Sequence, residues 1–402
     1  MNVGLFTESY VPQVNGVANT VQLLKRGLEE RGHTAHVFAP TVAGHRDDEA
    51  NVHRLPQLAS FRPVEKLLKF ELDWQIPSPT LSRYRAVMDA LDIVHTHHMF
   101  VIGLAAARYA RRRSIPTVFT NHTNYGQFDA IIRSGGLFGL AVRRWFGVVS
   151  NLTTGMVTPG QRMKAQLRGF GVRTEITTIP NAVDLSKFGA PAAGAVAALR
   201  QRYGIGPDER VLLYVGRLSR EKNLVFLLES LAPLLREEAD VRAVFVGDGK
   251  LRADLERASR ALGVAGRTLF TGYVPFEQVH DYFYLGDMFV TASLSEVFPL
   301  TVIEGLAASL PVVAIDAVGT GDIVEDGQNG LLVSEDQEEF AAATRRLLQD
   351  HDLRRRLSTG ASASVGRLSI ASCVDAHLAL YRRYHDGAAY PSNSCSSRRT
   401  VL

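Results

Sequence analysis

Short apolar runs alternate with segments of helical periodicity along the first half of the chain. The run at 3–6 is followed by residues 15–31, whose apolar positions recur every three or four residues as far as Gly32. The first pattern is typical of a buried strand, and the second of an amphipathic helix that ends at a glycine. The same alternation predicts further strands at 36–39, 93–95, 117–120, 156–158 and 176–179, and helices near 101–113 and 160–169.

The alternation is interrupted by two stretches rich in glycine and proline, at 189–194 and 204–208, which flank a short helical piece. Such a composition is typical of loops and linkers. Beyond it, strands are predicted at 211–215, 243–246, 268–271, 288–291 and 312–315, with helices near 223–237, 250–262, 276–285 and 300–309.

Strands that alternate with helices favour parallel βαβ units. We therefore expect an α/β protein with two Rossmann-like, doubly wound domains that face each other across a cleft. The expected limits are 1–185 for the first domain, 186–208 for a linker, 209–368 for the second domain, 369–386 for a helix crossing back to the first domain, and 387–402 for a disordered tail.

Composition narrows the class of protein. Apolar residues make up 46% of the chain, which is too many for a disordered protein, and no run of about 18 apolar residues is present to span a bilayer. The first residues, MNVGLFTESY, lack the basic segment of a signal peptide. Two cysteines, Cys373 and Cys395, are too few for a disulfide framework. We expect a cytoplasmic protein.

Charge is distributed unevenly along the chain. Residues 1–185 contain 21 basic and 14 acidic residues, a net charge of +7, whereas the remainder carries −3. A basic first half favours an anionic surface or ligand on that side. A solvated cationic face without any partner explains the asymmetry equally well.

The first predicted strand ends in a loop that leads directly into a helix at Asn15 and Gly16. A glycine at a helix N-terminus lets backbone N–H groups and the helix dipole approach an anion, although the pair is also an ordinary cap and turn. The loop lacks the G-x-G-x-x-G fingerprint, which disfavours a nicotinamide or flavin dinucleotide.

Histidines gather after two other strands of the first half. His95, His97 and His98 follow one strand, and His122 and Tyr125 follow the next. Ligands of open α/β sheets lie beyond the carboxyl ends of the strands, so these side chains are candidates for ligand contact. A metal is not expected, because no helical carboxylate–histidine pattern accompanies them. Hydrogen-bonded structural histidines are the alternative.

The first strand of the second half is followed by Gly216, Arg217 and Lys222. The guanidinium offers a bidentate fork and the ammonium a point charge, a combination that suits a diphosphate. Alone, these residues are more typical of an ordinary basic surface loop.

A more specific motif covers residues 295–307. Glu296 and Glu304 stand eight residues apart on either side of a predicted helix start at Pro299. The backbone N–H groups of Leu300 and Thr301 would point out of that N-terminus toward phosphate oxygens. Glu304 would lie about one turn inside, where a carboxylate can accept hydrogen bonds from a ribose diol.

Together these motifs resemble the retaining, GT-B-fold nucleotide-sugar glycosyltransferases of family 4. The resemblance covers nearly the whole chain. It rests on the E-x7-E pair, the Gly216–Lys222 loop, the Asn15-Gly16 loop, and the sequences at 179–184 and 246–249. Two positions depart from the usual pattern: Ala182 replaces a glycine, and Asp322 stands where relatives often have glutamate.

The resemblance implies a role for each matched residue. The second domain would bind the nucleotide sugar (UDP- or GDP-linked) and the first domain the acceptor. Arg217 and Lys222 would contact the diphosphate, Glu304 the ribose, Glu296 the sugar hydroxyls, Gly16 the β-phosphate, and His97 the transferred sugar and the acceptor. We expect front-face transfer with retention and no metal, because the two cations stabilise the leaving phosphate. No nucleic acid or separate cofactor is expected.

The opening loop and residues 121–125 resemble the branch of the family that glycosylates diacylglycerol. A segment with Leu137, Phe138, Arg143, Arg144 and Trp145 has the mixture of apolar, aromatic and basic residues of an interfacial helix. Residues 61–70 and 111–113 add further basic positions. We therefore expect a membrane-lipid acceptor and peripheral attachment to the anionic inner face of the cell membrane. The alternative for 137–146 is an ordinary helix packed on the sheet.

Three other functions stay open. The first is an α-mannosyltransferase, or another hexosyltransferase, that acts on a soluble or polyprenyl-linked cell-envelope acceptor. The second is a non-catalytic nucleotide-sugar binder, against which the intact Glu296/Glu304 and Arg217/Lys222 sets argue. The third is a dehydrogenase, which the short glycine match at 247–249 disfavours.

Overall fold

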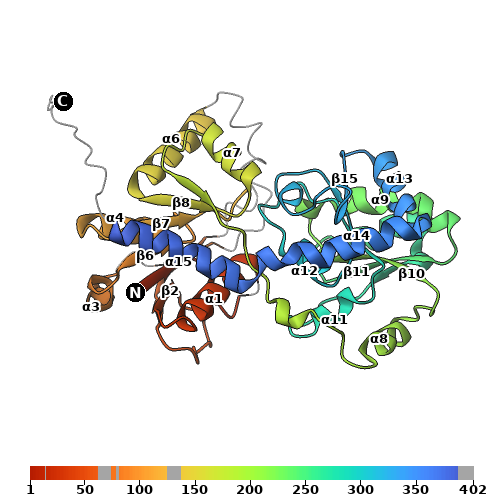
Figure 1. The fold of residues 1–402 in the computed structure, drawn as a ribbon, viewed down its shortest axis with the longest axis horizontal. Coiled ribbons are helices and arrows are strands. Elements are labelled where there is room, and N and C mark those ends of the chain that lie inside the picture. The colour runs from red at the N-terminus through yellow and green to blue at the C-terminus, as the bar shows by residue number, and fades with distance from the viewer. Residues whose placement is uncertain (14, 62–73, 78–80, 125–136, 388–402) are drawn as a thin grey trace.

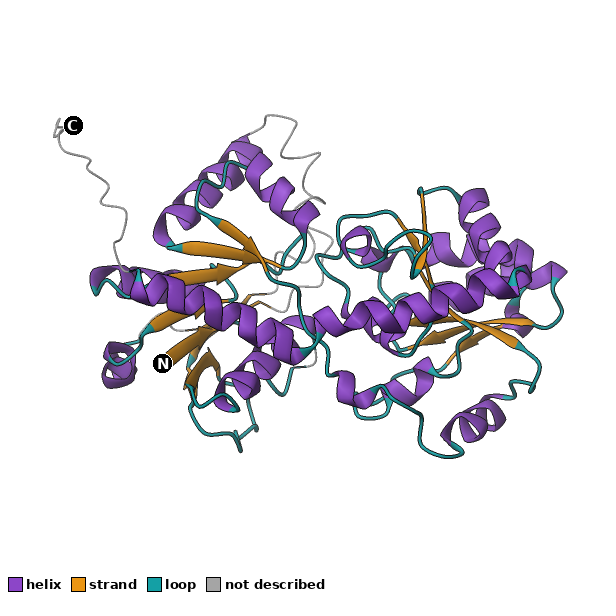
Figure 2. Cartoon of the chain, viewed as in Figure 1, coloured by secondary structure: helices purple, strands orange, loops and turns teal. Residues whose placement is uncertain are grey.

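The computed structural model describes the chain except residues 14, 62–73, 78–80, 125–136 and 388–402. At 57–61, 74–77, 137, 138 and 142 it describes the backbone alone. The chain forms two lobes, each with a central sheet covered by helices (Figures 1 and 2). The predicted tail, Tyr125 and most of the basic segment 61–70 lie outside the described residues.

The first lobe contains a parallel sheet of seven strands in the order β3-β2-β1-β6-β7-β8-β9. A separate antiparallel pair, β4 (Gln57–Phe61) and β5 (Trp74–Pro77), lies beside it. The helices are α1 (Gly16–Glu29), α3 (Arg85–Asp89), α4 (Val101–Arg112), α6 (Leu137–Leu152) and α7 (Gln161–Gly169). The strands of the main sheet are β1 (Asn2–Phe6), β2 (Thr34–Pro40), β3 (Val52–Leu55), β6 (Ile93–Thr96), β7 (Thr117–Thr120), β8 (Gly155–Thr158) and β9 (Ile176–Thr178).

The second lobe contains a parallel sheet of six strands in the order β12-β11-β10-β13-β14-β15. Its strands are β10 (Arg210–Val215), β11 (Val241–Val246), β12 (Thr268–Phe270), β13 (Met288–Thr291), β14 (Val312–Ile315) and β15 (Gly330–Val333). Its helices are α8 (Ala195–Tyr203), α9 (Leu224–Glu237), α10 (Arg252–Ala261), α11 (Val279–Phe283), α12 (Leu300–Ala307), α13 (Gln337–Gln349) and α14 (His351–Ser364).

The fold class is as expected from the sequence, but two edge strands were missed. Two of the four residues of β3 are polar, and β15 is a four-residue strand. β3 is mostly half-buried, so its pattern is weak, whereas β15 is apolar and largely buried but very short. Within the segment predicted as a linker, α8 packs against the second core through Val196, Leu199 and Tyr203.

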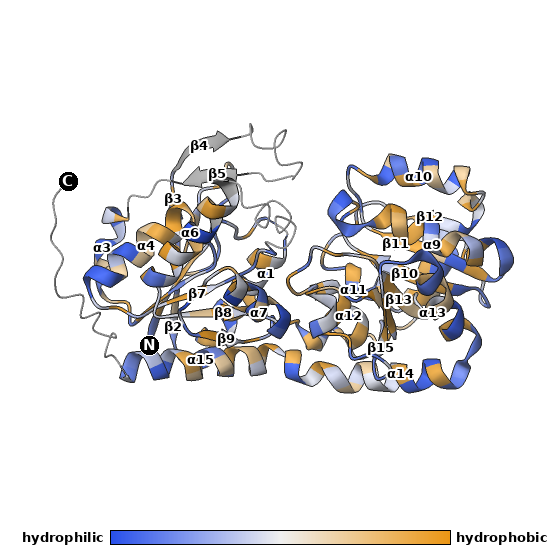
Figure 3. Cartoon of the chain, turned by 90° about the horizontal axis from the view of Figure 1, so that it is seen from above, coloured by the Kyte–Doolittle hydropathy of each residue, from blue (hydrophilic) through white to orange (hydrophobic). Residues whose placement is uncertain are grey.

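The last helix, α15 (Ile370–Asp386), returns to the first lobe. It lies beside that lobe while α14 lies along the second, on the same side of the molecule (Figures 1 and 3). Val374, Leu378 and Tyr381 belong to the same core cluster as β1 and α1. A Cβ at Gly27 would lie 2.4 Å from a methyl group of Val374, so a glycine is required for this close approach of α1 and α15.

Two chain segments cross between the lobes, and they are paired with each other. The N–H of Val183 donates to the carbonyl of Leu368 at 3.1 Å, and Val183 forms a parallel bridge with Ser369. The two crossings therefore lie side by side, and any change in the angle between the lobes must bend both.

Candidate functional site

The order of the strands in the two sheets indicates where the site lies. In the first sheet β1 lies between β2 and β6, and in the second β10 lies between β11 and β13, so the chain runs away from each central strand in both directions. Open α/β sheets bind ligands in the crevice beyond the strand ends at such a point, so the loops that follow these strands are expected to line it. The loops after β1, β6, β10 and β13 carry Gly16, His97, Lys222 and Glu296 respectively.

Two helix N-termini from different lobes approach each other at this crevice. The side chain of Asn15 accepts a hydrogen bond from the N–H of Ala18 at 3.0 Å and caps α1. An ideal Cβ on Gly16 would lie 3.8 Å from a methyl group of Leu300, the first residue of α12. Pro299 precedes α12 in an extended conformation and its side chain makes no capping hydrogen bond, so the N–H groups of the first turn, including that of Thr301, lie at the helix end next to Gly16. Both N-termini favour negative charge.

A lysine and a glutamate are joined beside these N-termini. The ammonium of Lys222 contacts the carboxylate of Glu296, and both side chains are about one-quarter exposed or less. Arg217 forms an ion pair with Glu221 at 3.1 Å and is far more exposed. The backbone carbonyl of Glu296 also accepts a hydrogen bond from Asn124 of the first lobe at 3.3 Å. Lys222 and Glu296 are thus brought together, Arg217 pairs instead with Glu221, and Asn124 of the His122 loop reaches the backbone of Glu296.

Glu304 lies in the second turn of α12, 9% exposed. Burial raises the pKa of its carboxyl to about 7, and the positive charge of Lys187 acts in the opposite direction. Glu304 lines a cavity of about 650 Å³ between the lobes, whose other walls come from α1, the crossing segment and α11. The ammonium of Lys187 lies 4.4 Å from the ring centroid of Phe276 at the same cavity. Lys187 was not predicted from the sequence, because a lysine beyond a short Pro-Asn-Ala-Val-Asp segment carries no signal of its own.

The histidines form a column in which His95 and His97 are buried and His122 is partly exposed. His97 is 2% exposed, and its Nδ1 lies 2.9 Å from Nε2 of His122. On the other side, the ring of His95 packs 4.3 Å from that of His97, with its nitrogens 2.6 Å from the hydroxyls of Tyr381 and Thr120. Burial holds the pKa of His97 well below its usual range and lowers that of His122 to about 3. These imidazoles are therefore neutral at physiological pH.

Glu8 connects the first loop to the histidine loop, and sequence reasoning missed it. Its carboxylate accepts the N–H of Val101 at 2.9 Å and so caps α4, while its own N–H donates to Nδ1 of His98 at 3.1 Å. Burial raises the pKa of Glu8 to about 7, and the hydrogen bonds from α4 oppose that shift. The position after the first strand was the available signal.

Asp322, the departure from the family pattern, joins the two lobes. Its carboxylate accepts the N–H groups of Gln161 and Arg162 at 3.0 and 3.1 Å, so a side chain of the second lobe caps α7 of the first. Arg162 also pairs with Asp316. A Cβ at Gly160 would lie 2.0 Å from the Asp322 carboxylate, so Gly160 permits this contact. The lobes are thereby held together at the rim of the crevice.

Replacement of Asp322 by alanine is expected to loosen α7 without unfolding it. Loss of an N-cap costs about 0.5 to 2 kcal/mol, which corresponds to amide exchange at Gln161 and Arg162 that is faster by about two- to thirtyfold. Hydrogen–deuterium exchange measures this. Asp336→Ala, which removes the cap of α13 inside the second lobe, is the matched control and should leave α7 protected. Unchanged exchange at α7 in Asp322→Ala would mean that the cap is not formed in solution.

The helix predicted to be interfacial is α6, and one of its predicted membrane residues does not lie on the exposed face. Arg143 and Arg144 are exposed, as are Leu140 and Val148 at 63% and 47%. Trp145, which was predicted to face the membrane, instead packs inward: its ring stacks on Phe100 at 5.6 Å, next to the buried ring of Phe146. Helical periodicity turns these aromatics toward the sheet. The side chains of Leu137 and Phe138 lie outside the described residues.

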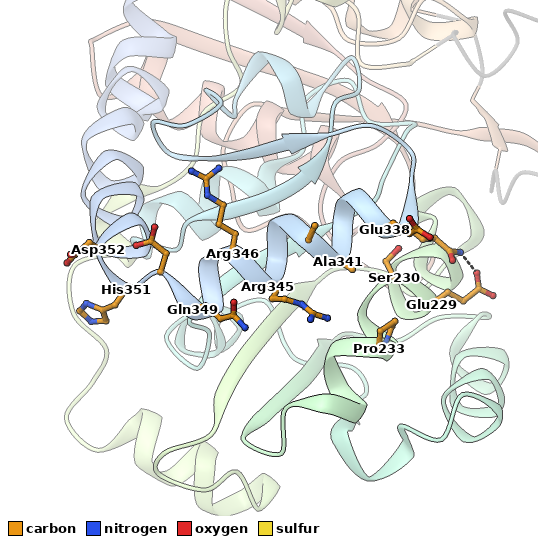
Figure 4. Close-up of a pocket in the computed structure, with 13 residues that line it drawn as sticks. Glu229, Ser230, Pro233, Glu338, Ala341, Arg345, Arg346, Gln349, His351 and Asp352 are labelled. Carbon is orange, nitrogen blue, oxygen red and sulfur yellow. Dashed lines mark hydrogen bonds between the residues drawn. The ribbon is translucent and has the colours of Figure 1, made fainter.

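Among the described residues, no group of three or more His, Cys, Asp or Glu side chains could hold a metal ion, and no helix there is long and apolar enough to cross a membrane. A larger cavity of about 990 Å³ lies in the second lobe between α9 and α13 (Figure 4). Glu229 and Gln337 bridge it with a 2.7 Å hydrogen bond. Its walls are helix surfaces with mixed charges, away from the strand ends, so it lacks the features of the crevice.

The architecture and crevice define a GT-B glycosyltransferase fold. The structure superposes on that of Anabaena HepE in complex with UDP with a TM-score of 0.75 and 18% identity, covering 94% of this chain and 99% of the other. Residues 14–187 match the family model described as Glycosyltransferase Family 4, and residues 196–363 that described as Glycosyl transferases group 1. The chain belongs to these family 4 glycosyltransferases, which move a sugar from a nucleotide donor, and the predicted family is confirmed.

The names of two relatives state different substrates, an acceptor in one and a donor in the other. The α-monoglucosyldiacylglycerol synthase of Streptococcus pneumoniae is 29% identical over 358 residues, 88% of this chain and 80% of the relative. The GDP-mannose-dependent α-mannosyltransferase of Mycobacterium tuberculosis is 30% identical over 376 residues, 91% of this chain and 92% of the relative.

Proposed function

We propose that the crevice transfers a hexose from a nucleoside diphosphate sugar to a membrane lipid, diacylglycerol, with retention of configuration, and so forms an α-glycolipid. Two contacts carry the donor part of this proposal: Lys222 touches Glu296, four residues before α12, and the first residue of α12, Leu300, lies against Gly16 at the start of α1. Arg217, Lys222 and the helix N-termini bind the diphosphate, Glu304 the ribose, and Glu296 the hexose hydroxyls. No metal is needed, because cations and helix dipoles already oppose the negative charge of the leaving group.

The reaction is a front-face displacement. The bond from the anomeric carbon to the leaving phosphate breaks while the acceptor hydroxyl attacks from the same face, and the departing phosphate takes the hydroxyl proton. Gly16 lets the backbone of α1 approach the β-phosphate, and His97 lies beside the hexose and the acceptor. Asn15 and His122 are on the acceptor side of the crevice.

A lipid acceptor is favoured by the named activity of the Streptococcus pneumoniae relative and by the exposed face of α6. Leu140 and Val148 offer apolar contacts and Arg143 and Arg144 offer charge, the combination of an interfacial helix. The protein would then act as a peripheral enzyme at the cytoplasmic leaflet. The Mycobacterium tuberculosis relative supports the alternative, an α-mannosyltransferase that uses GDP-mannose.

A donor panel tests the function. The protein is incubated with UDP-glucose, UDP-galactose or GDP-mannose, with and without diacylglycerol in anionic vesicles, and both the released nucleotide diphosphate and the anomeric configuration of the product are followed. Lipid-dependent release from one donor with an α-linked product is expected. A β-linked product would refute retention, and release that ignores the lipid would favour a soluble acceptor.

The double variant Arg143→Gln/Arg144→Gln is expected to bind anionic vesicles about thirtyfold more weakly, because each cation near an anionic leaflet contributes about 1 kcal/mol. Vesicle co-sedimentation measures the partition. The control is Arg257→Gln/Arg355→Gln, which removes two exposed arginines of the second lobe, each paired with an aspartate three residues away. Equal binding by both double variants would place the membrane contact elsewhere.

A further inference from the structure

His97 has one hydrogen-bonding atom in contact with the protein and one without. Its Nδ1 faces Nε2 of His122 at 2.9 Å, and the two rings are inclined by only 16°. Its Nε2 is buried and finds no partner among the described residues. A buried polar atom without a partner costs stability, so this nitrogen is held ready for a ligand atom.

The ring of His97 is fixed on its other side by a histidine that cannot turn. Both nitrogens of His95 are bonded to hydroxyls, Nδ1 to Tyr381 of α15 and Nε2 to Thr120. His377, also on α15, packs 5.5 Å from the ring of His95. Burial keeps His95, His98 and His377 neutral by lowering the pKa of each.

Proton counting sets the state of the pair. A neutral imidazole carries one N–H, so the hydrogen bond between the two rings uses either the N–H of His97 Nδ1 or that of His122 Nε2. If His97 donates, its free Nε2 is an acceptor, and if His122 donates, that Nε2 is a donor, so the contact couples the tautomers of the two rings. The hydrogen bond also fixes the rotation of the ring and so the direction of Nε2.

We propose that His122 is a positioning residue, whose hydrogen bond couples its tautomer to that of His97 and holds the ring so that Nε2 of His97 meets a hydroxyl of the transferred hexose. This inference rests on the proposed function, and it gives His122, on the acceptor side of the crevice, an action on the hexose through His97. Partners that orient a ligating histidine typically change activity by about ten- to a hundredfold when they are removed.

A double-mutant cycle tests whether His122 acts through His97. The four proteins are the wild type, His97→Ala, His122→Phe and the double variant, assayed by lipid-dependent release of the nucleotide diphosphate. His122→Phe keeps a planar ring but loses the hydrogen bond. It should lower kcat about ten- to a hundredfold while the donor KM changes by less than about threefold. In the His97→Ala background the same change should alter kcat by less than about twofold.

The outcomes separate this inference from the function on which it rests. Full activity in His97→Ala would refute the role of His97 itself. A loss in His97→Ala with none in His122→Phe would overturn the positioning role alone. Effects that multiply in the double variant would also overturn it, because His122 would then act independently.

A spectroscopic measurement distinguishes loss of the His97–His122 hydrogen bond from general damage to the fold. In protein labelled with ¹⁵N-histidine, the Nδ1 resonance that is lost in His97→Ala belongs to His97. It should move in His122→Phe and return toward its original position in His122→Gln, whose amide restores a hydrogen-bonding group, together with part of the activity. A resonance that stays in place in His122→Phe would contradict the proposal.

Discussion

Replacement of Lys222 by glutamine is expected to lower kcat by about a hundred- to a thousandfold. Removal of one preorganised group that stabilises transition-state charge costs this much in other enzymes. Two effects contribute to this loss. The leaving phosphate loses a cation, and the carboxylate of Glu296, which Lys222 contacts, is left unpaired next to that phosphate. Steady-state release of nucleotide diphosphate measures kcat and the donor KM separately.

Arg220→Gln is the matched control, because Arg220 lies in the same loop and its side chain is exposed. It should keep kcat within about twofold of the wild type. The double variant Lys222→Gln/Glu296→Gln should not recover kcat, because the cation is still missing and a contact to the hexose hydroxyls is lost as well. Near-normal turnover in Lys222→Gln would exclude this lysine from the reaction.

Replacement of Glu304 by glutamine is expected to stabilise the protein at high pH and to weaken donor binding. Burial raises the pKa of Glu304 from 4.5 to about 7 in the folded state. Between these values the folded state holds a proton that the unfolded state has released. The stability that Glu304 contributes is therefore complete below pH 4.5 and is lost as the pH rises through 7.

Glutamine does not titrate, so the variant should gain about 2 to 3 kcal/mol in free energy of unfolding relative to the wild type between pH 5 and pH 8. Denaturant unfolding at the two pH values measures the difference, and Glu8, which is also shifted, cancels because both proteins contain it. Glu338→Gln, the same change at an exposed side chain of α13, controls for the substitution. A neutral amide accepts hydrogen bonds from a ribose diol more weakly than a carboxylate, so the Kd for nucleoside diphosphate should rise about tenfold. If the free energy of unfolding changed with pH in the same way in the wild type and in Glu304→Gln, Glu304 would not be buried in solution.

The sequence was sufficient to predict the elements on which the crevice depends. Buried parallel strands are continuous apolar runs, and each is followed by a loop with unusual residues, as at Lys222 and Glu296. The E-x7-E spacing located the start of α12 because a proline and an apolar helix follow the first glutamate. These are local signals that need no knowledge of the partner lobe.

Contacts between distant segments could not be predicted in the same way. Asp322 and Gln161 are 161 residues apart, and neither has a sequence pattern that reports a cap shared between lobes. His97 and His122 were each found at a strand end, but their hydrogen bond depends on the order of neighbouring strands β6 and β7. The inward packing of Trp145 depends on the rotation of α6 against the sheet, which composition does not determine.

The position of α15 has a consequence for synthesis of the protein. The first core is completed by residues 370–386, which the ribosome makes after the whole second lobe. Until then α1 and β1 lack the cover that Val374, Leu378 and Tyr381 provide, and an apolar surface stays open on the nascent chain. The second lobe has all of its strands between residues 210 and 333, so it can fold first although it is made second. Chaperone binding to the nascent chain should therefore be concentrated on the first lobe and end only when the last helix emerges.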